Sequence, residues 1–163
     1  MMFFKSLTAA LMLSFAILAA PAAADDGKLQ GFAQIQTADG RIDIDTYHVV
    51  REDGTDLRIG LLSIVVPGKH ISVTFDKSEF PTLWTLWQNA QARQSASWQP
   101  VGDYVETGTT DVSHLRISAG PGVRFMIESP ANGAFTSELP ASSFSQFSSA
   151  LQSAESFVAA GKE

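Results

Sequence analysis

The sequence FPTLWTLWQNAQAR occupies positions 80–93 and predicts one amphipathic helix. At 100° per residue, its apolar side chains fall within one arc of about 160°. They are Phe80, Leu83, Trp84, Leu86, Trp87 and Ala90. Pro81 lacks an N–H group and fits only the first helical turn, so Ser78 is the predicted N-cap. We expect this helix to run from about Glu79 to Arg93 and to pack through one face.

The same pattern returns near the end of the sequence, between about Ser143 and Ala159. A shift of 64 positions places Phe80 on Phe144, and Ser142 then matches the predicted cap. The apolar arc of this second helix contains Phe144, Phe147, Ala150, Leu151, Ala154, Phe157 and Val158. The sequence therefore predicts an internal repeat.

Short segments with strand character precede each predicted helix and are separated by turn residues such as Asp39-Gly40. The segments are 31–37, 41–50, 56–66 and 70–75 in the first half, and 98–107, 113–118, 123–129 and 134–139 in the second. This pattern predicts an α+β fold of two ββββα repeats, at about residues 30–93 and 97–160. We expect two antiparallel sheets, each covered by the helix of its own repeat.

Alternation along the strands predicts which faces are buried. Odd positions are mainly apolar in both halves: Tyr47, Val49, Leu57, Ile59 and Leu61, then Leu115, Ile117, Val123, Phe125 and Ile127. We expect these side chains to lie under the helices. Ile42 and Ile44 are apolar at even positions, and a bulge or bend near Thr46 would reconcile this by switching faces.

The first 24 residues have the composition of a secretory signal peptide. Lys5 supplies a positive charge, residues 7–20 form a short apolar core, and small residues precede Asp25. The unbroken apolar run is shorter than the ~20 residues that a membrane-spanning helix needs. We expect cleavage after Ala24, export to the periplasm or the medium, and no stable membrane insertion afterwards. The remaining residues, 25–163, have the usual size of one domain.

Composition excludes several classes of chemistry. The sequence contains no cysteine, so disulfides, thiolate metal sites and cysteine nucleophiles are excluded. Without the predicted signal peptide, 10 basic residues face 17 acidic ones, and the net charge is −7. We expect no nucleic-acid partner, because a phosphate-binding surface is basic. The sequence also lacks the common nucleotide-binding and zinc-hydrolase motifs, and we expect no cofactor and no metal.

One strand face carries the candidate ligand- or partner-binding residues, all at even positions of the predicted strands. They are Arg58, Arg124, His48, His114 and Met126. A mixed polar and apolar sheet face of this kind suits a protein, a small molecule or a second copy of the chain as its partner. The arginines are equally well explained as solvated partners of Glu128 and Glu138.

The order of four strands and a helix, used twice, resembles that of the Pur-alpha and Whirly single-strand nucleic-acid-binding proteins. That resemblance implies a basic, aromatic-rich sheet that binds DNA or RNA, which the acidic charge of this chain contradicts. The sequence instead favours a small exported binding or protein-interaction module without catalytic activity. The alternative is a periplasmic hydrolase whose acid and base meet only in the folded chain.

Overall fold

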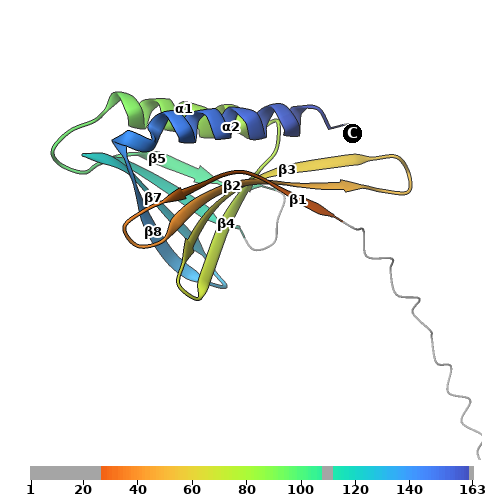
Figure 1. Cartoon of the computed structure of the whole chain (residues 1–163), viewed down its shortest axis with the longest axis horizontal. Coiled ribbons are helices and arrows are strands. Elements are labelled where there is room, and N and C mark those ends of the chain that lie inside the picture. The colour runs from red at the N-terminus through yellow and green to blue at the C-terminus, as the bar shows by residue number, and fades with distance from the viewer. Residues whose placement is uncertain (1–26, 108–111, 162–163) are drawn as a thin grey trace, which may run out of the picture.

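The structure is a computed structural model that describes residues 27–107 and 112–161. The predicted signal peptide lies outside the described residues. Within these ranges the chain is α+β, with two antiparallel four-stranded sheets and two helices (Figure 1). The first sheet contains, in chain order, β1 (Lys28–Gln36), β2 (Arg41–Val50), β3 (Asp56–Val66) and β4 (Lys69–Phe75). The second contains β5 (Gln99–Val105), β6 (His114–Ala119), β7 (Gly122–Ser129) and β8 (Gly133–Pro140).

Each half ends in a helix, as the sequence pattern predicts. Helix α1 (Phe80–Ala92) follows β4. A single 3₁₀ turn (Ala141–Ser143) separates β8 from α2 (Phe144–Ala159). The two helices begin 64 positions apart, in agreement with the shift that aligns their apolar arcs.

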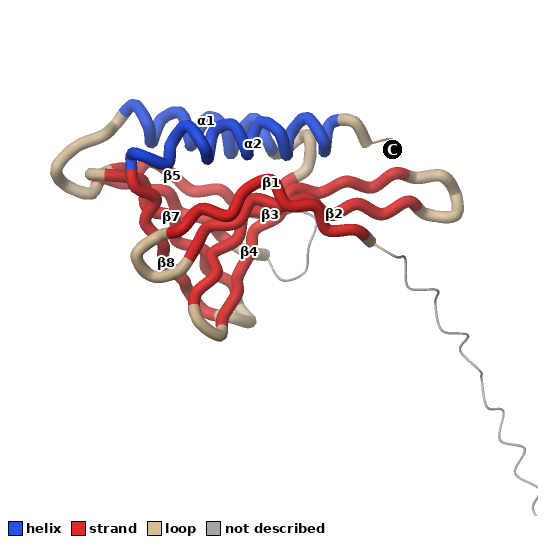
Figure 2. Tube along the Cα trace, viewed as in Figure 1, coloured by secondary structure: helices blue, strands red, loops and turns tan. Residues whose placement is uncertain are grey.

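Each sheet is covered by the helix of the opposite half. Helix α2 packs across β1, β2 and β3, whereas α1 packs on β5 and β6. Figure 2 shows both helices in one layer above the strands. The expectation that each helix covers its own sheet is therefore wrong. Apolar periodicity specifies which face of a helix is buried but not which sheet it meets, and this exchange interlocks the two halves.

Trp87 lies at the centre of a core shared by both halves. Its fully buried ring contacts Phe147 of α2 at a centroid distance of 4.4 Å and Phe125 of β7 at 6.2 Å. Its Nε1–H donates to the Ser148 hydroxyl at 2.8 Å. One aromatic side chain thus joins both helices to the second sheet, and its single polar atom is satisfied.

The second sheet follows the predicted alternation. The odd-numbered residues of β6 and β7 are buried against the helices: Leu115, Ile117, Val123, Phe125 and Ile127. His114 and Arg116 are exposed on the opposite face, and Arg124 and Met126 are half-buried there. The prediction is confirmed for this half because one face is apolar and the other is mixed.

Most of the first sheet has the opposite burial pattern to the one predicted, although Val49, at an odd position, is buried as expected. Ile42, Ile44 and Leu62, at even positions, have no exposed surface, whereas Tyr47 is 36% exposed. The strand pair β2–β3 has no register shift. The β1–β2 pair does shift, between Gly31 and Ala33 opposite Asp45 and Ile44, but the extra residue lies on β1, so it does not switch the faces of β2 as expected. The even face of this sheet meets α2. Its odd face is also rich in apolar residues, and alternation alone therefore gave the wrong face.

The turn that leads into α1 is capped by a different residue from the one predicted, and Glu79, directly before Phe80, makes no side-chain cap to the helix itself. Asp76 Oδ1 accepts hydrogen bonds from the backbone N–H groups of Ser78 and Glu79, at 2.7 and 2.9 Å. Glu79 Oε2 in turn accepts from the Asp76 N–H at 3.0 Å. This reciprocal pair is a capping box. Ser78 is therefore a donor within the turn and not the cap.

Candidate functional site

The five predicted site residues do not form one surface. His48 and Arg58 lie opposite each other on β2 and β3 and face the end of α2. Arg124, Met126 and His114 lie on the exposed face of the second sheet. In the first half the histidine and the arginine are cross-strand partners, but in the second His114 faces Glu128. The second half therefore has no counterpart of the His48–Arg58 pair, and its β6–β7 hairpin is shorter than β2–β3.

His48 and Arg58 belong to a cluster that fastens the end of α2 to the first sheet. Arg58 Nε and Nη2 lie 3.0 and 2.7 Å from the two Asp56 carboxylate oxygens, and Nη1 donates to the Phe157 carbonyl at 3.2 Å. The guanidinium also lies 4.5 Å from the centroid of the Phe157 ring. His48 Nε2 approaches Asp56 Oδ1 at 2.7 Å. We call Asp56, Arg58, His48 and Phe157 the helix clasp.

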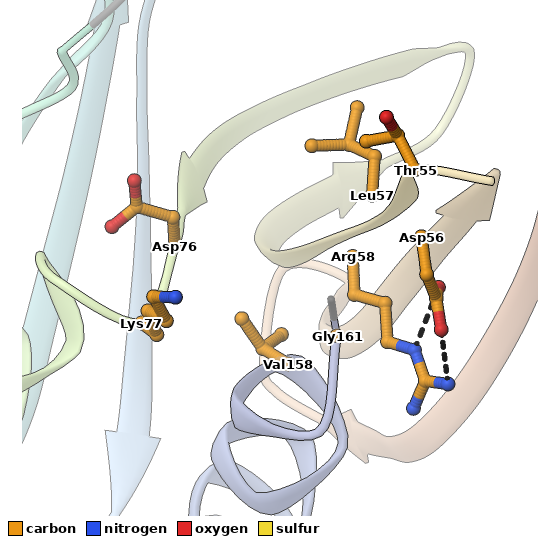
Figure 3. Close-up of a pocket in the computed structure, with 8 residues that line it drawn as sticks. All are labelled: Thr55, Asp56, Leu57, Arg58, Asp76, Lys77, Val158 and Gly161. Carbon is orange, nitrogen blue, oxygen red and sulfur yellow. Dashed lines mark hydrogen bonds and ion pairs between the residues drawn. The ribbon is translucent and has the colours of Figure 1, made fainter. Parts of the chain in front are cut away.

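The helix clasp borders a small cavity of about 100 Å³ (Figure 3). Figure 3 shows the Arg58 side chain turned toward Asp56, with Val158 and Gly161 of the C-terminal segment beside it. The hydrogen bonds from Arg58 hold the pKa of the Asp56 carboxyl below its usual value of 3.8. Because Arg58 is engaged by the Asp56 carboxylate and by the ring and carbonyl of Phe157, the clasp is arranged to stabilise the fold.

The exposed face of the second sheet carries paired charges. Arg116 lies 3.8 Å from Asp103 and 3.7 Å from Glu128, and both of its partners are exposed. Such long, exposed ion pairs contribute little to stability. Acidic groups here outnumber the arginines, so this face does not have the charge of an anion-binding surface.

A groove of about 430 Å³ lies where the two halves meet. The β1–β2 turn contributes one side, and the ends of β7 and β8 with Trp98 contribute the other. We call it the junction groove; its lining residues are Gln36, Thr37, Ala38, Trp98, Pro121, Gly122, Glu138, Leu139 and Pro140. A single ring, two prolines and a few polar groups make a lining typical of small-ligand sites.

Arg124 holds two lining residues of the junction groove in place. Its guanidinium lies over the Trp98 ring, 4.0 Å from the centroid, and its Nη2 approaches Glu138 Oε1 at 2.6 Å. The backbone of Gly120 lies against the same indole so closely that a Cβ would come within 2.6 Å of the ring. Of the predicted site residues, Arg124 is therefore the one that the fold places at this groove.

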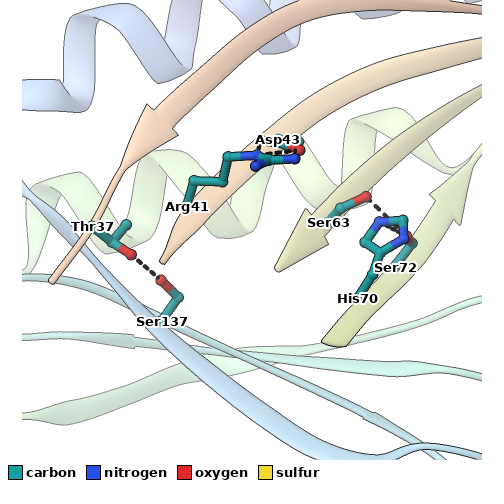
Figure 4. A network of polar contacts seen from close by, with 7 residues as sticks. All are labelled: Thr37, Arg41, Asp43, Ser63, His70, Ser72 and Ser137. Carbon is teal, nitrogen blue, oxygen red and sulfur yellow. Dashed lines mark hydrogen bonds and ion pairs between the residues drawn. The ribbon is translucent and has the colours of Figure 1, made fainter. Parts of the chain in front are cut away.

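A polar network lies on the odd face of the first sheet and on neighbouring β8 (Figure 4). Arg41 Nε contacts both carboxylate oxygens of Asp43, at 2.8 and 2.9 Å. The Ser72 hydroxyl lies 2.8 Å from that of Ser63 and 3.1 Å from His70 Nε2. A serine hydroxyl beside an imidazole is part of a hydrolase triad. Within residues 27–107 and 112–161, however, no carboxylate lies within ion-pair distance of His70.

A buried carboxylate that the sequence did not single out lies between the two sheets. Glu106 is 6% exposed and accepts hydrogen bonds from the N–H and hydroxyl groups of Thr74 and from the Ser113 N–H. Tyr104 donates to the Thr74 carbonyl at 2.5 Å. Burial, with the charge of Glu79 second, raises the pKa of Tyr104. Glu106 and Tyr104 therefore provide hydrogen-bond partners for the outward backbone groups of Thr74 and connect β4 to β5.

Neither a cation cluster nor a membrane-spanning helix occurs in the described part of the chain. No group of three or more histidine and acidic residues there could hold a metal ion. No helix in those ranges is long and apolar enough to cross a bilayer. Comparisons with protein-family models, with curated proteins and with solved structures found no match.

Proposed function

We propose that the protein is a small, exported, non-catalytic binding module and that the junction groove is its ligand site. The observation that carries the proposal is the composition of the groove, which combines residues of both halves around one indole. Export rests on the pattern of residues 1–24. The groove has the volume of a small-ligand site, and Arg124 orders Trp98 and Glu138 before any ligand arrives.

The arrangement of Arg124 supports binding more than catalysis. Glu138 accepts two hydrogen bonds from Arg124, at 3.0 and 2.6 Å, and a carboxylate held in this way is a fixed acceptor. The Ser72–His70 pair of the hydrolase alternative lies outside the junction groove. The proposed module therefore acts by recognition at the groove and not by acid–base chemistry.

We also infer that the two halves arose from one duplicated ββββα unit. The equal order of elements and the helices beginning at Phe80 and Phe144 support this inference. The element order of the Pur-alpha and Whirly proteins is an analogy for the fold alone. A second partner mode, homodimer formation, is tested with the experiments below.

The test is a two-dimensional ¹H–¹⁵N NMR screen of the mature protein against a library of fragment-sized compounds with apolar rings. We expect concerted shifts of the Trp98 indole and of the Thr37, Ala38 and Gly122 amides. Arg124→Ala should abolish these shifts, because it frees both Trp98 and Glu138. Arg116→Ala is the matched control, since that arginine lies on the same face in looser ion pairs. Shifts confined to other surfaces would overturn the proposal.

A further inference from the structure

Three of the four edge strands of the two sheets are protected against pairing with another chain. β1 has a register shift between Gly31 and Ala33, and β5 has a proline and a register shift between Pro100 and Gly102. The edge of β4 is blocked at Thr74, because its N–H donates to the Glu106 carboxylate and its carbonyl accepts from the Tyr104 hydroxyl. Bulges, prolines and covering side chains are the usual means of blocking an edge. β8, the fourth edge, pairs with β7 without any register shift.

The register of β8 shows which of its backbone groups point outward. Pro140 faces Gly122 and has no N–H to offer, so this is a non-hydrogen-bonded pair. The hydrogen bond of the Gly122 carbonyl supports this assignment. That carbonyl accepts from the Gly120 N–H at 2.9 Å, on the β6 side of the strand, and so does not point toward β8. Hydrogen-bonded and non-bonded pairs alternate along an antiparallel ladder. The N–H and carbonyl groups of Ala134, Thr136 and Glu138 therefore point away from β7.

The residues that carry these outward groups, Ala134, Thr136 and Glu138, are all exposed. Within the described ranges, no hydrogen bond outside the β7–β8 ladder reaches their backbone atoms. The row of free donors and acceptors leads directly into the junction groove, whose lining begins at Glu138 on the same strand. An unpaired edge that ends in a partly apolar groove is the arrangement used for strand addition.

We propose that the β8 edge binds an extended peptide segment, which adds a strand to the second sheet and places an apolar side chain in the junction groove. Main-chain hydrogen bonds to Thr136 and its neighbours supply affinity, and the groove beside Trp98 supplies selectivity. The net charge of the chain is −6, which favours a neutral or basic peptide over an acidic one. This inference rests on the proposed function, because it assigns the ligand class of the same groove.

The experiment begins with a phage-displayed library of random linear peptides, selected on the mature protein. Selected peptides are synthesised, and their affinity is measured by calorimetry. Thr136→Pro removes one outward N–H while leaving the ladder to β7 intact, and Thr136→Val is the matched control that keeps this N–H. We expect Thr136→Pro to weaken binding about tenfold, as the loss of one or two main-chain hydrogen bonds implies. Thr136→Val should bind as the native protein does.

Hydrogen exchange gives a second readout that needs no variant. Peptide binding should slow the exchange of the Ala134, Thr136 and Glu138 amides, because these gain partners. Amides of the blocked β4 edge, such as that of Thr74, should not change. Unchanged exchange on β8 in the presence of a bound peptide overturns strand addition, even if Thr136→Pro fails to fold.

The outcomes separate this inference from the proposed function. If peptides bind Thr136→Pro and the native protein equally but lose affinity for Trp98→Ala, the groove is a ligand site and strand addition is wrong. If apolar fragments occupy the groove and no peptide is selected, strand addition is likewise wrong. If neither fragments nor peptides reach the groove, both proposals fail. Light scattering could instead detect a dimer that Thr136→Pro dissociates. That result would assign the β8 edge to a second copy of the chain and overturn the proposal of peptide binding.

Discussion

The ring of Trp87 on α1 lies 4.4 Å, centroid to centroid, from the ring of Phe147 on α2. This contact joins two helices that each cover the sheet of the opposite half. Trp87 is fully buried and also contacts Phe125 beneath it. It is therefore the side chain through which the exchanged helices and the second sheet share one core.

Replacing Trp87 with alanine should destabilise the protein by about 3–5 kcal/mol, the usual cost of a large cavity in a core. Trp84 is the matched control, because it is only half-buried and stacks on Phe80 at the margin of the core. Urea denaturation followed by circular dichroism measures both changes. Equal losses for the two tryptophans would contradict the central position of Trp87.

The exchange of helices predicts that neither half folds alone. Fragments 27–93 and 97–161 should each lack the near-ultraviolet circular dichroism of ordered aromatic side chains, because each lacks the helix that covers its sheet. An equimolar mixture should recover that signal. A native-like spectrum from either fragment by itself would show that the halves are independent.

Asp76→Ala should cost about 1 kcal/mol, the typical contribution of an N-cap side chain. The Asp76 carboxylate accepts two backbone N–H groups in the turn directly before α1 and forms a capping box with Glu79. Ser78→Ala removes a hydroxyl that donates to the same carboxylate and leaves the cap in place. Thermal unfolding should therefore distinguish the two variants, and a larger loss for Ser78→Ala would restore serine as the cap.

The helix clasp predicts a stability term that depends on pH. The folded pKa of Asp56 is lowered by Arg58, so its stabilisation is complete above its usual pKa of 3.8 and is lost as the pH falls through the lowered value. Asp56→Asn should reduce the melting temperature near neutral pH by a few degrees. The difference from the native protein should close well below pH 3.8. A difference that stays constant down to the most acidic pH would exclude this linkage.

The contribution of Asp45 to stability should depend on pH in the opposite direction to that of Asp56. Burial and the charge of Asp43 raise the folded pKa of Asp45, so its ionised form is disfavoured in the fold as the pH rises above 3.8. Asp45→Asn should increase stability near neutral pH, by less than about 1 kcal/mol because the group is partly solvated, and should give no gain at acidic pH. Glu52→Gln, in the exposed β2–β3 loop, is the control and should change little.

The sequence was sufficient to predict the strands and helices but not their tertiary partners. Turn residues and alternation placed β2 and β3 correctly, and the Trp87 arc placed α1 within one residue at each end. The face of the first sheet was wrong because Ile59 and Leu62, on opposite faces of β3, are equally apolar in sequence. The sequence feature that favours the even face is the pair Ile42 and Ile44, both of which are fully buried.

The candidate site was predicted less well than the fold. Arg124 lies at the junction groove, whereas Arg58 is engaged by Asp56 and Phe157. No sequence pattern could show this, because Phe157 is 99 positions from Arg58 and meets it only after the helices exchange. The capping box could have been found, since Asp76 and Glu79 have the required spacing. The contact of Trp98 with Arg124 depends on the fold and has no sequence signal.

The position of α2 also determines the order in which the protein can mature. α2 follows every strand in the described residues, yet it covers β1, the first of them. During translation the apolar face of the first strands therefore remains exposed to solvent until α2 has been synthesised. A ribosome that stalls before residue 144 leaves a product with no way to hide this surface, and such a product is a natural target for chaperones and proteases.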